Sequence, residues 1–296
     1  MSLMFIDSNT LSDIADAIRA KTGDTNDMTP LEMPAEISSI SGGGSVILSG
    51  TSEPTSAQGE DGQIYLKYGS VESDLEYITN NSTNAYIPTG ENGNNYKKFV
   101  ITCNIHGGGS YATPIGGRTS VTAQNLLMFF KYNGTYNAQY AVNSSDTAFY
   151  DVSAYVDKKI TLTLSNEVIR VEDENGNYLE KAPANTNAFV TPPLALFNLA
   201  TSASGVYGND TACYMDLYDC KVYESGNLKK WLVPKTENGT IGMVDAMDGT
   251  FYAGIGTLTG TSRSDPLQFK PIVNAYAKIG GIWQKLIGTD IDDISA

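Results

Sequence analysis

The strongest constraint on this fold is a period-two alternation of apolar and polar residues that recurs from about residue 74 to residue 262. KFVITCNI at 98–105 and KKITLTLSN at 158–166 both place apolar side chains at every second position. Successive side chains of a strand point to opposite faces, so this pattern predicts strands with one buried and one hydrated face. Such strands are typical of antiparallel sheets, and we therefore expect a mainly β fold.

Glycine-containing pairs mark the expected turns between strands. Asn175-Gly176 and Asp248-Gly249 each separate two strand-like segments, and Gly280-Gly281 separates AYAKI from IWQKL. These pairs tolerate positive φ at both central positions of a type I′ turn, so we predict two-residue hairpins at all three sites. The last hairpin is expected outside the main β region. Its apolar residues should incline to one face: Ala277, Ile279, Ile282 and Leu286.

A helical segment precedes the β region. TLSDIADAIRAKT at 10–22 places Leu11, Ile14, Ala15 and Ile18 at helical spacing, which predicts an amphipathic helix. MTPLEMPAEISSI follows, and Pro34 should limit it to one or two helical turns. Together these segments are expected to form an adaptor too short to hold a core of its own.

The chain is therefore divided into four expected parts. SGGGS at 41–45 has the composition of a flexible linker, and the acidic end DIDDISA is interpreted as a solvated tail. The parts are a helical adaptor over 1–40, a Gly/Ser linker with a short strand over 41–70, a β-sandwich over 71–262, and a C-terminal hairpin with its tail over 263–296.

Charge and hydropathy argue against two classes of partner. The chain has 19 Lys and Arg against 33 Asp and Glu, a net charge of -14. This charge repels a phosphate backbone and forgoes counterion release, so no nucleic-acid partner is expected. No run of about 18 apolar residues is present, so no membrane insertion is expected. The N-terminal residues also lack the basic and apolar regions of a secretory signal.

The cysteines and the single histidine show no catalytic pattern. Cys103, Cys213 and Cys220 lack the CxxC spacing of metal or redox sites, so they are expected to be small buried hydrophobic residues. His106, in NIHGGGS, is expected to lie in a turn and has no evident partner.

Four phrases of the sequence carry a resemblance. They are LEYITNNSTNAYIPTG at 75–90, PIGGRTS at 114–120, DCKVYESGNLKKWLVP at 219–234 and MVDAMDGTFYAGIGTLTG at 243–260. In this order they resemble the concanavalin A-like, laminin G-like lectin sandwich of bacteriophage and prophage tail and receptor-binding proteins, and the helical opening resembles leader segments of such proteins. The resemblance implies an antiparallel β-sandwich of the jelly-roll type. Trp231 in KKWLVP is expected to be a core anchor, with a ligand platform as the alternative.

The same resemblance implies a place and a set of partners. A tail protein is made in the bacterial cytoplasm, which suits the lack of a visible signal peptide, and becomes part of the virion tail. Other tail subunits are the expected protein partners, with a homo-oligomer as one form of that assembly. A bacterial surface glycan is the expected ligand.

Glycoside hydrolases also use this fold, with Glu-x-Asp-x-Glu on one strand. Glu72, Asp74 and Glu76 have that spacing and should share one strand face. A retaining glycosidase needs two carboxyls about 5–5.5 Å apart and an acid with a raised pKa. The polar flanks provide no apolar walls to raise a pKa, so we expect a non-enzymatic protein and keep hydrolysis as an alternative.

Calcium is a further alternative, because laminin G-like domains often carry it. Asp173, Asn175 and Asn177 in DENGN could offer oxygen ligands, but Gly176 is misplaced for an EF-hand loop and already explained by a hairpin. We therefore expect no cofactor, with Ca²⁺ as the open alternative.

Tyrosines gather in FFKYNGTYNAQYAVNSSDTAFY at 129–150. An aromatic face can stack on the C–H face of a sugar while polar groups bind its hydroxyls. The candidate carbohydrate-binding residues are Arg118, Tyr132, Asn133, Tyr136, Tyr140, Asp146 and Tyr150. The leading hypothesis is a tail protein whose sandwich recognises a host glycan. The alternatives are tyrosines that only cover sheet surface, and a purely structural tail or baseplate component.

Overall fold

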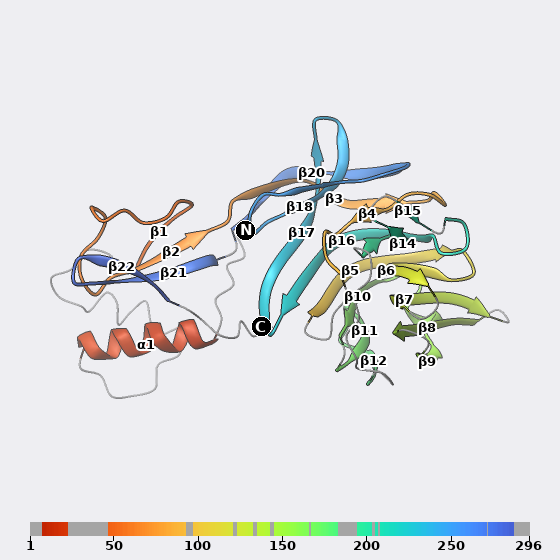
Figure 1. The fold of residues 1–296 in the computed structure, drawn as a ribbon, viewed down its shortest axis with the longest axis horizontal. Helices are drawn as coiled ribbons and strands as arrows, with labels where there is room; N and C mark the ends of the chain where they lie inside the picture. Colours follow the sequence, from red (N-terminus) through yellow and green to blue (C-terminus); the bar gives the residue numbers. More distant parts are fainter. Residues whose placement is uncertain are drawn as a thin grey trace. The chain divides into compact units, whose positions relative to one another are not determined.

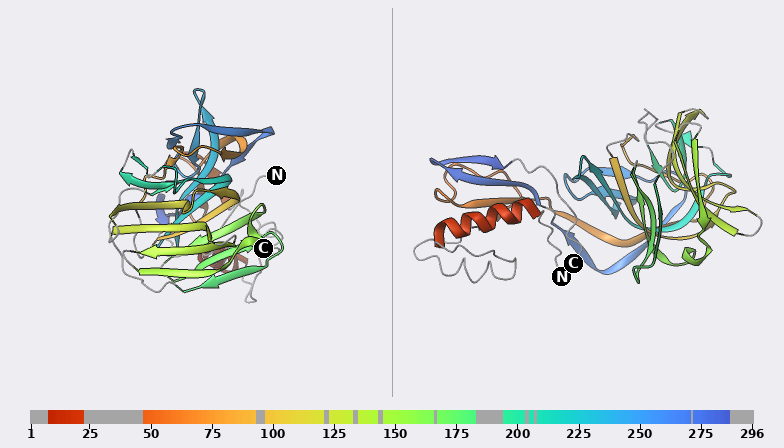
Figure 2. Two further views of the ribbon diagram at one scale, coloured as in Figure 1. Left: turned by 90° about the vertical axis from the view of Figure 1, so that its right-hand side faces the viewer. Right: turned by 90° about the horizontal axis from the view of Figure 1, so that it is seen from below.

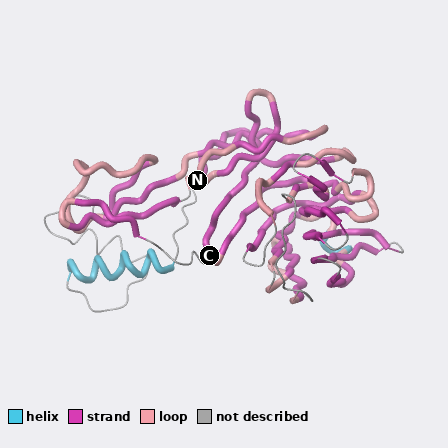
Figure 3. The backbone as a smooth tube through the Cα atoms, viewed as in Figure 1, coloured by secondary structure: helices cyan, strands magenta, loops and turns pink. Residues whose placement is uncertain are grey.

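The computed structural model describes residues 8–22, 47–92, 97–120, 123–132, 135–142, 145–165, 167–182, 194–202, 205–206, 208–270 and 272–286. The chain forms two compact units (Figures 1 and 3). Unit 1 comprises residues 1–71 and 268–296, and unit 2 comprises residues 72–267. Unit 2 is therefore an insertion within the chain of unit 1. None of the described helices is long and apolar enough to cross a membrane.

Unit 1 joins both ends of the chain in one four-stranded sheet. Its strand order is β1 (Ile47–Gly50), β2 (Ile64–Tyr68), β21 (Ile272–Ile279) and β22 (Ile282–Leu286). β1 runs parallel to β2, and the other two pairings are antiparallel. The sandwich is inserted between β2 and β21, which are neighbours in the sheet.

The helix α1 (Ser8–Thr22) supplies the core of unit 1. Its buried stripe of Ile14, Ala15 and Ile18 packs against strand residues from both ends of the chain. These strand residues include Ile64, Leu66 and Ala275. The predicted helix is confirmed. The helix, β2 and β21 were expected in three separate parts of the chain, but they share one core, because no single segment can cover the apolar stripe of the helix.

The other face of this sheet is covered by the loop at 51–63. The Trp283 indole Nε1 donates to the carbonyl of Thr55 at 3.0 Å. Lys278 is only 6% exposed. Its ammonium donates at 2.8 Å to each of three carbonyls, those of Ser56, Gln58 and Gly59. Because a buried charge needs such partners, Lys278 fixes this loop on the sheet.

Unit 2 is a sandwich of two sheets, whose layers are visible in Figure 2. The first has ten strands in the order β12-β11-β10-β5-β16-β17-β18-β19, and β3 pairs with both β16 and β20. Their bounds are β3 Val71–Asn80, β5 Lys97–Gly108, β10 Lys159–Leu164, β11 Ile169–Asp173, β12 Tyr178–Lys181, β16 Cys213–Glu224, β17 Asn227–Glu237, β18 Thr240–Asp245, β19 Phe251–Ala253 and β20 Leu258–Phe269.

The second sheet has eight strands. Its order is β15-β14-β6-β7-β8-β9, and β13 pairs with both β4 and β6. Most neighbours are antiparallel, whereas β14 runs parallel to β6. The bounds are β4 Ile87–Pro88, β6 Ala112–Ser120, β7 Ala123–Tyr132, β8 Thr135–Val142, β9 Ser145–Asp151, β13 Ala195–Leu196, β14 Leu199–Ser202 and β15 Gly205–Val206, and a 3-10 turn, η1, spans Ser153–Tyr155.

The sandwich core follows the alternation seen in the sequence. On β5, Phe99, Ile101, Cys103 and Ile105 are buried between the sheets, while the residues between them point away. All three cysteines are free and buried, as expected. The predicted fold class is confirmed: a mainly β, largely antiparallel sandwich with a short N-terminal helix and a C-terminal hairpin.

The predicted hairpin at Gly280-Gly281 is confirmed. Both glycines have positive φ, 60° and 78°, and Ile279 pairs directly with Ile282. The expected common face agrees with the register, because Ile279 and Ile282 are cross-strand partners and Ala277 and Leu286 lie at alternate positions on the same side. The two isoleucines are nevertheless 57% and 66% exposed. They flank the tip of the hairpin, beyond the part of the sheet that the helix covers.

The other two predicted turns are wider than two residues. At Asn175-Gly176 only the glycine has positive φ, and the Asp173 N–H donates to the Asn177 carbonyl. At Asp248-Gly249 the Asp245 N–H donates to the Thr250 carbonyl. Asp173 Oδ1 accepts the N–H groups of Asn175 and Asn177, and Asp245 Oδ1 accepts the N–H of Met247. This side-chain capping favours the wider turn.

Candidate functional site

The predicted tyrosine tract lies on three neighbouring strands of the eight-stranded sheet. Tyr132 is the last residue of β7 and pairs with Thr135. Tyr140 on β8 pairs with Leu127 and Thr147. Asp146 and Tyr150 are on β9. Asn133 lies outside the described residues.

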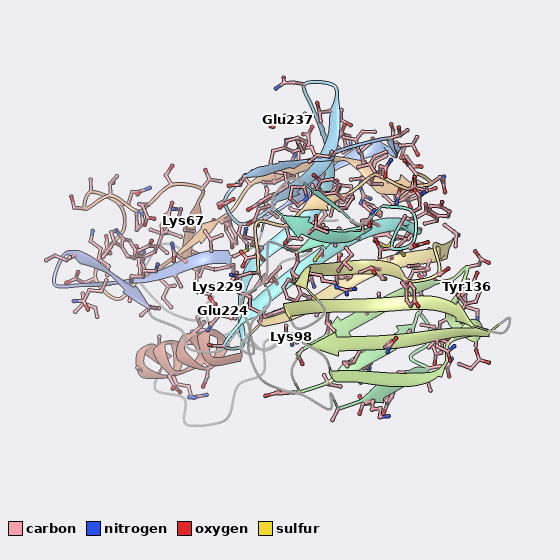
Figure 4. The ribbon with its side chains drawn as sticks, turned by 45° about the vertical axis from the view of Figure 1, so that its right-hand side comes forward. Lys67, Lys98, Tyr136, Glu224, Lys229 and Glu237 are labelled. Atoms are coloured by element: carbon pink, nitrogen blue, oxygen red, sulfur yellow. The ribbon has the colours of Figure 1, made fainter. Side chains whose placement is uncertain are left out.

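Two other predicted residues, Tyr136 and Arg118, are half-buried. Tyr136 packs against the sandwich core, and its N–H donates to the Ser153 hydroxyl at 3.2 Å. Figure 4 shows it at one end of the sandwich, at the β7–β8 hairpin. Arg118 lies near the end of β6, opposite Gln124 of β7. The Tyr136 ring thus covers core, as the alternative interpretation of these tyrosines allowed.

The three carboxylates of the hydrolase alternative point to the non-core side of β3. They alternate with the buried residues Val71, Ser73 and Leu75. Glu72 and Glu76 are exposed. Asp74 Oδ1 accepts the N–H of Thr236 at 2.8 Å, so the middle carboxylate links β3 to β17.

The suggested calcium ligands form a hairpin turn. The Asp173 carboxylate accepts hydrogen bonds from the side chain of Asn177 and from the backbone N–H groups of Asn177 and Asn175, which together lower its pKa. Within the described part of the chain, no cluster of three or more His, Cys, Asp or Glu side chains is placed to hold a metal ion.

A different set of residues gathers on the outer face of the ten-stranded sheet. We call it the outer-face cluster: Tyr77, Asn104, His106, Lys159, Asp216 and Tyr218. It spans four neighbouring strands, because Asn104 of β5 pairs with Asp216 of β16 on one side and with Lys159 of β10 on the other. β3 pairs with the far side of β16. The alternate residues on these strands are buried in the core, so the cluster points away from it.

Two aromatic rings form the apolar part of this cluster. The Tyr77 and Tyr218 ring centroids are 5.2 Å apart with an interplanar angle of 52°. The Lys159 ammonium lies 4.6 Å from the Tyr218 centroid, a cation–π contact. Burial, reinforced by the charge of Asp216, raises the pKa of Tyr218 to about 12. Its hydroxyl therefore remains a hydrogen-bond donor at neutral pH.

His106 lies between two carboxylates. Its Nδ1 is 3.0 Å from Asp157 Oδ1, and its Nε2 is 2.9 Å from Asp216 Oδ2. Burial opposes the charged imidazolium, but the hydrogen bonds to both aspartates outweigh burial and raise the His106 pKa. The expectation of a turn histidine without a partner is wrong. β5 continues through His106, and its partners are 51 and 110 residues away in sequence.

Asn104 contributes a buried amide oxygen. Its Oδ1 is buried and has no hydrogen-bond partner among the described residues. Buried polar atoms are nearly always paired, so this oxygen marks a place where a donor is missing. The cluster therefore combines an aromatic pair with the charged groups Asp216 and Lys159 within one patch of sheet, around this buried oxygen.

The fold and this patch define a class: a two-sheet β-sandwich that presents an aromatic and polar outer face. No family model matches the chain, and no curated protein matches it. Several solved structures are similar to it in fold. A candidate carbohydrate-binding protein from Bacteroides ovatus has 10% identity and a TM-score of 0.42, over 66% of this chain and 62% of that one.

Two further solved structures show a similar level of likeness. The native heptameric SAP-like pentraxin from Limulus polyphemus has 10% identity and a TM-score of 0.42, over 64% of this chain and 96% of that one. Domains LG4-5 of the mouse laminin α1 chain have 11% identity and a TM-score of 0.35, over 68% and 48%. The likeness concerns the fold alone, and none of these proteins is a phage tail component by its description.

Proposed function

We propose that unit 2 binds carbohydrate through the outer-face cluster and does not cleave it. The observation that carries this proposal is the pair of Tyr77 and Tyr218 rings beside the carboxylate of Asp216. A sugar offers both complementary surfaces, since its C–H face can stack on a ring while its hydroxyls donate to a carboxylate. The Tyr218 hydroxyl adds a donor to the same patch.

The setting we propose is the tail of a phage or prophage. It is supported by the resemblance of the four sequence phrases and of the helical opening to tail proteins. On this proposal unit 1 attaches to other tail subunits, and unit 2 recognises a bacterial surface glycan. Several copies on one tail would raise the effective affinity of weak individual sites.

The test is a glycan-array and host-cell binding assay with the full chain. Replacing Tyr218 by Ala removes one stacking ring and should weaken binding at least about tenfold, and Tyr77→Ala should act in the same direction. Tyr111→Ala is the matched control, because Tyr111 is 52% exposed and lies in the β5–β6 connection. Unchanged binding by Tyr218→Ala would contradict the assignment of the face. Loss confined to Tyr136→Ala and Tyr150→Ala would instead place the site on the eight-stranded sheet.

The hydrolase alternative has its own test. The parent protein is incubated with the polysaccharide it binds, and released reducing ends are measured. We expect none, because Asp74 is engaged by the backbone of β17. Release of reducing ends by the parent that is lost in Glu76→Gln would establish catalysis.

A structural role in tail assembly is the second candidate function. It is favoured by the two exposed isoleucines at the β21–β22 tip, Ile279 and Ile282. If this tip mediates assembly, the chain should form oligomers by light scattering, and replacing both isoleucines by Ser should yield monomers. Oligomers together with a complete absence of glycan binding would favour this candidate over the first.

A further inference from the structure

We infer that the ligand of the outer-face cluster is a neutral glycan, and that acidic polysaccharides are rejected. This inference rests on the proposed function and names the class of ligand. It follows from the carboxylates that surround the Tyr77–Tyr218 pair and from the pairing of the nearby positive groups with those carboxylates.

Four carboxylates surround the aromatic pair. Asp216 precedes Tyr218 on β16 by two residues, and Glu76 directly precedes Tyr77 on β3. Asp157 and Glu174 complete the group at the ends of β10 and β11, through contacts with His106 and Lys159. The side chains of these last two carboxylates are 71% and 68% exposed, so their charges face the solvent from which a ligand arrives.

The positive groups of the face are held by these same neighbours. Lys159 lies over the Tyr218 ring, and its ammonium is 3.8 Å from the Glu174 carboxylate. His106 is bonded to Asp157 and Asp216 at once. Further along β16, Lys221 lies 5.1 Å from the centroid of the Trp231 ring. The face therefore keeps an excess of negative charge even with His106 protonated.

An acidic sugar ring placed on these tyrosines would bring its carboxylate within one Debye length, about 8 Å, of several like charges. Two such repulsions at about 6 Å in water weaken binding roughly tenfold. The net charge of -14 on the chain acts in the same direction. A neutral ring meets the same stacking surface and acceptors without this repulsion.

The experiment compares polymers that differ only at C6, and the salt dependence isolates the effect of charge. Amylose, galactan and mannan are each immobilised beside a form in which the C6 alcohols have been oxidised to carboxylates, and binding of the full chain is measured at low and high salt. We expect at least one neutral polymer to bind about tenfold more tightly than its oxidised form, with a smaller gap at high salt. Equal or tighter binding of the oxidised forms would overturn the inference while leaving carbohydrate binding intact. Binding of none of the polymers would overturn the inference and count against the proposed function as well.

A charge-removing variant locates the effect. Glu174→Gln should improve binding of the oxidised polymer several-fold and leave neutral binding unchanged. Glu224→Gln is the matched control. It changes the net charge equally, but it lies at the end of β16, six residues or about 20 Å beyond Tyr218. Figure 4 shows Glu224 near Lys98, at the end of the sandwich opposite Tyr136. Equal effects of the two variants would show that net charge, and not this face, sets the preference.

Discussion

Replacing Lys278 by Met should destabilise unit 1 selectively. The Lys278 ammonium is buried and donates to three carbonyls of the loop at 51–63, each at 2.8 Å. A hydrogen bond to a charged group contributes about 1.5–3 kcal/mol, but the carbonyls of this exposed loop can turn toward water in the variant, so we count about 1 kcal/mol for each bond. The free energy of unfolding should therefore fall by about 3 kcal/mol, and the unfolding equilibrium constant should rise roughly 150-fold.

The two tryptophans allow this change to be measured in unit 1 alone. Trp283 lies in unit 1 and Trp231 lies in unit 2. In a Trp231→Phe background, the urea-dependent fluorescence of Trp283 reports unit 1, and Lys278→Met should lower its midpoint by roughly 2 M. Lys285→Met is the control, because that lysine is exposed on the same hairpin. A midpoint unchanged by Lys278→Met would refute the view that the buried ammonium holds the loop.

Three further predictions concern unit 2, whose unfolding is measured by Trp231 fluorescence in a Trp283→Phe background. Because the His106 pKa is raised in the folded state, protonated His106 stabilises the fold fully below its unfolded pKa of about 6.5. This stabilisation is lost as the pH rises through the folded pKa. The urea midpoint should therefore fall from pH 6 to pH 8, and His106→Gln should flatten this change. A pH profile identical in the variant would contradict this. Ile101 is 0% exposed, so Ile101→Ala should lower the free energy of unfolding by about 3–4 kcal/mol. A decrease below about 1 kcal/mol would mean that the core collapses around the cavity. Gly239 has a φ of 77° and lies in a turn with open space where a Cβ would lie. Gly239→Ala should therefore lower the free energy of unfolding by about 1 kcal/mol through backbone strain alone. An unchanged free energy of unfolding would show that the turn adapts.

Local patterns were enough to predict the strands and one of the turns. The alternation at 98–105 identifies β5 and its buried face, because burial of one face of a strand leaves a period of two in the sequence. The Gly280-Gly281 turn is equally local, since both residues adopt positive φ without a side chain to clash. At Asn175-Gly176 the same signal predicts a hairpin but not its width, which depends on the carboxylate of Asp173.

The candidate site depends on contacts that have no local signature. Tyr77 meets Tyr218 only because β3 pairs with β16, and His106 meets Asp216 only through the β5–β16 pairing. The sequence pattern predicts a binding site at tyrosines that are close along the chain, at 129–150. The outer-face cluster is instead assembled from four strands spread over residues 77–218. Period-two spacing does give the outward face of each strand, but it cannot say which outward faces become neighbours.

The insertion of the sandwich between two paired strands bears on how this protein could diversify. Tyr68, the last residue of β2, and Ile272, the first residue of β21, are cross-strand partners, so their Cα atoms are about 5 Å apart. Any compact module whose own ends lie this close could replace the present one without disturbing the strand pairing of unit 1. The pairing of β2 with β21 thus does not depend on the length or fold of the chain that runs between them.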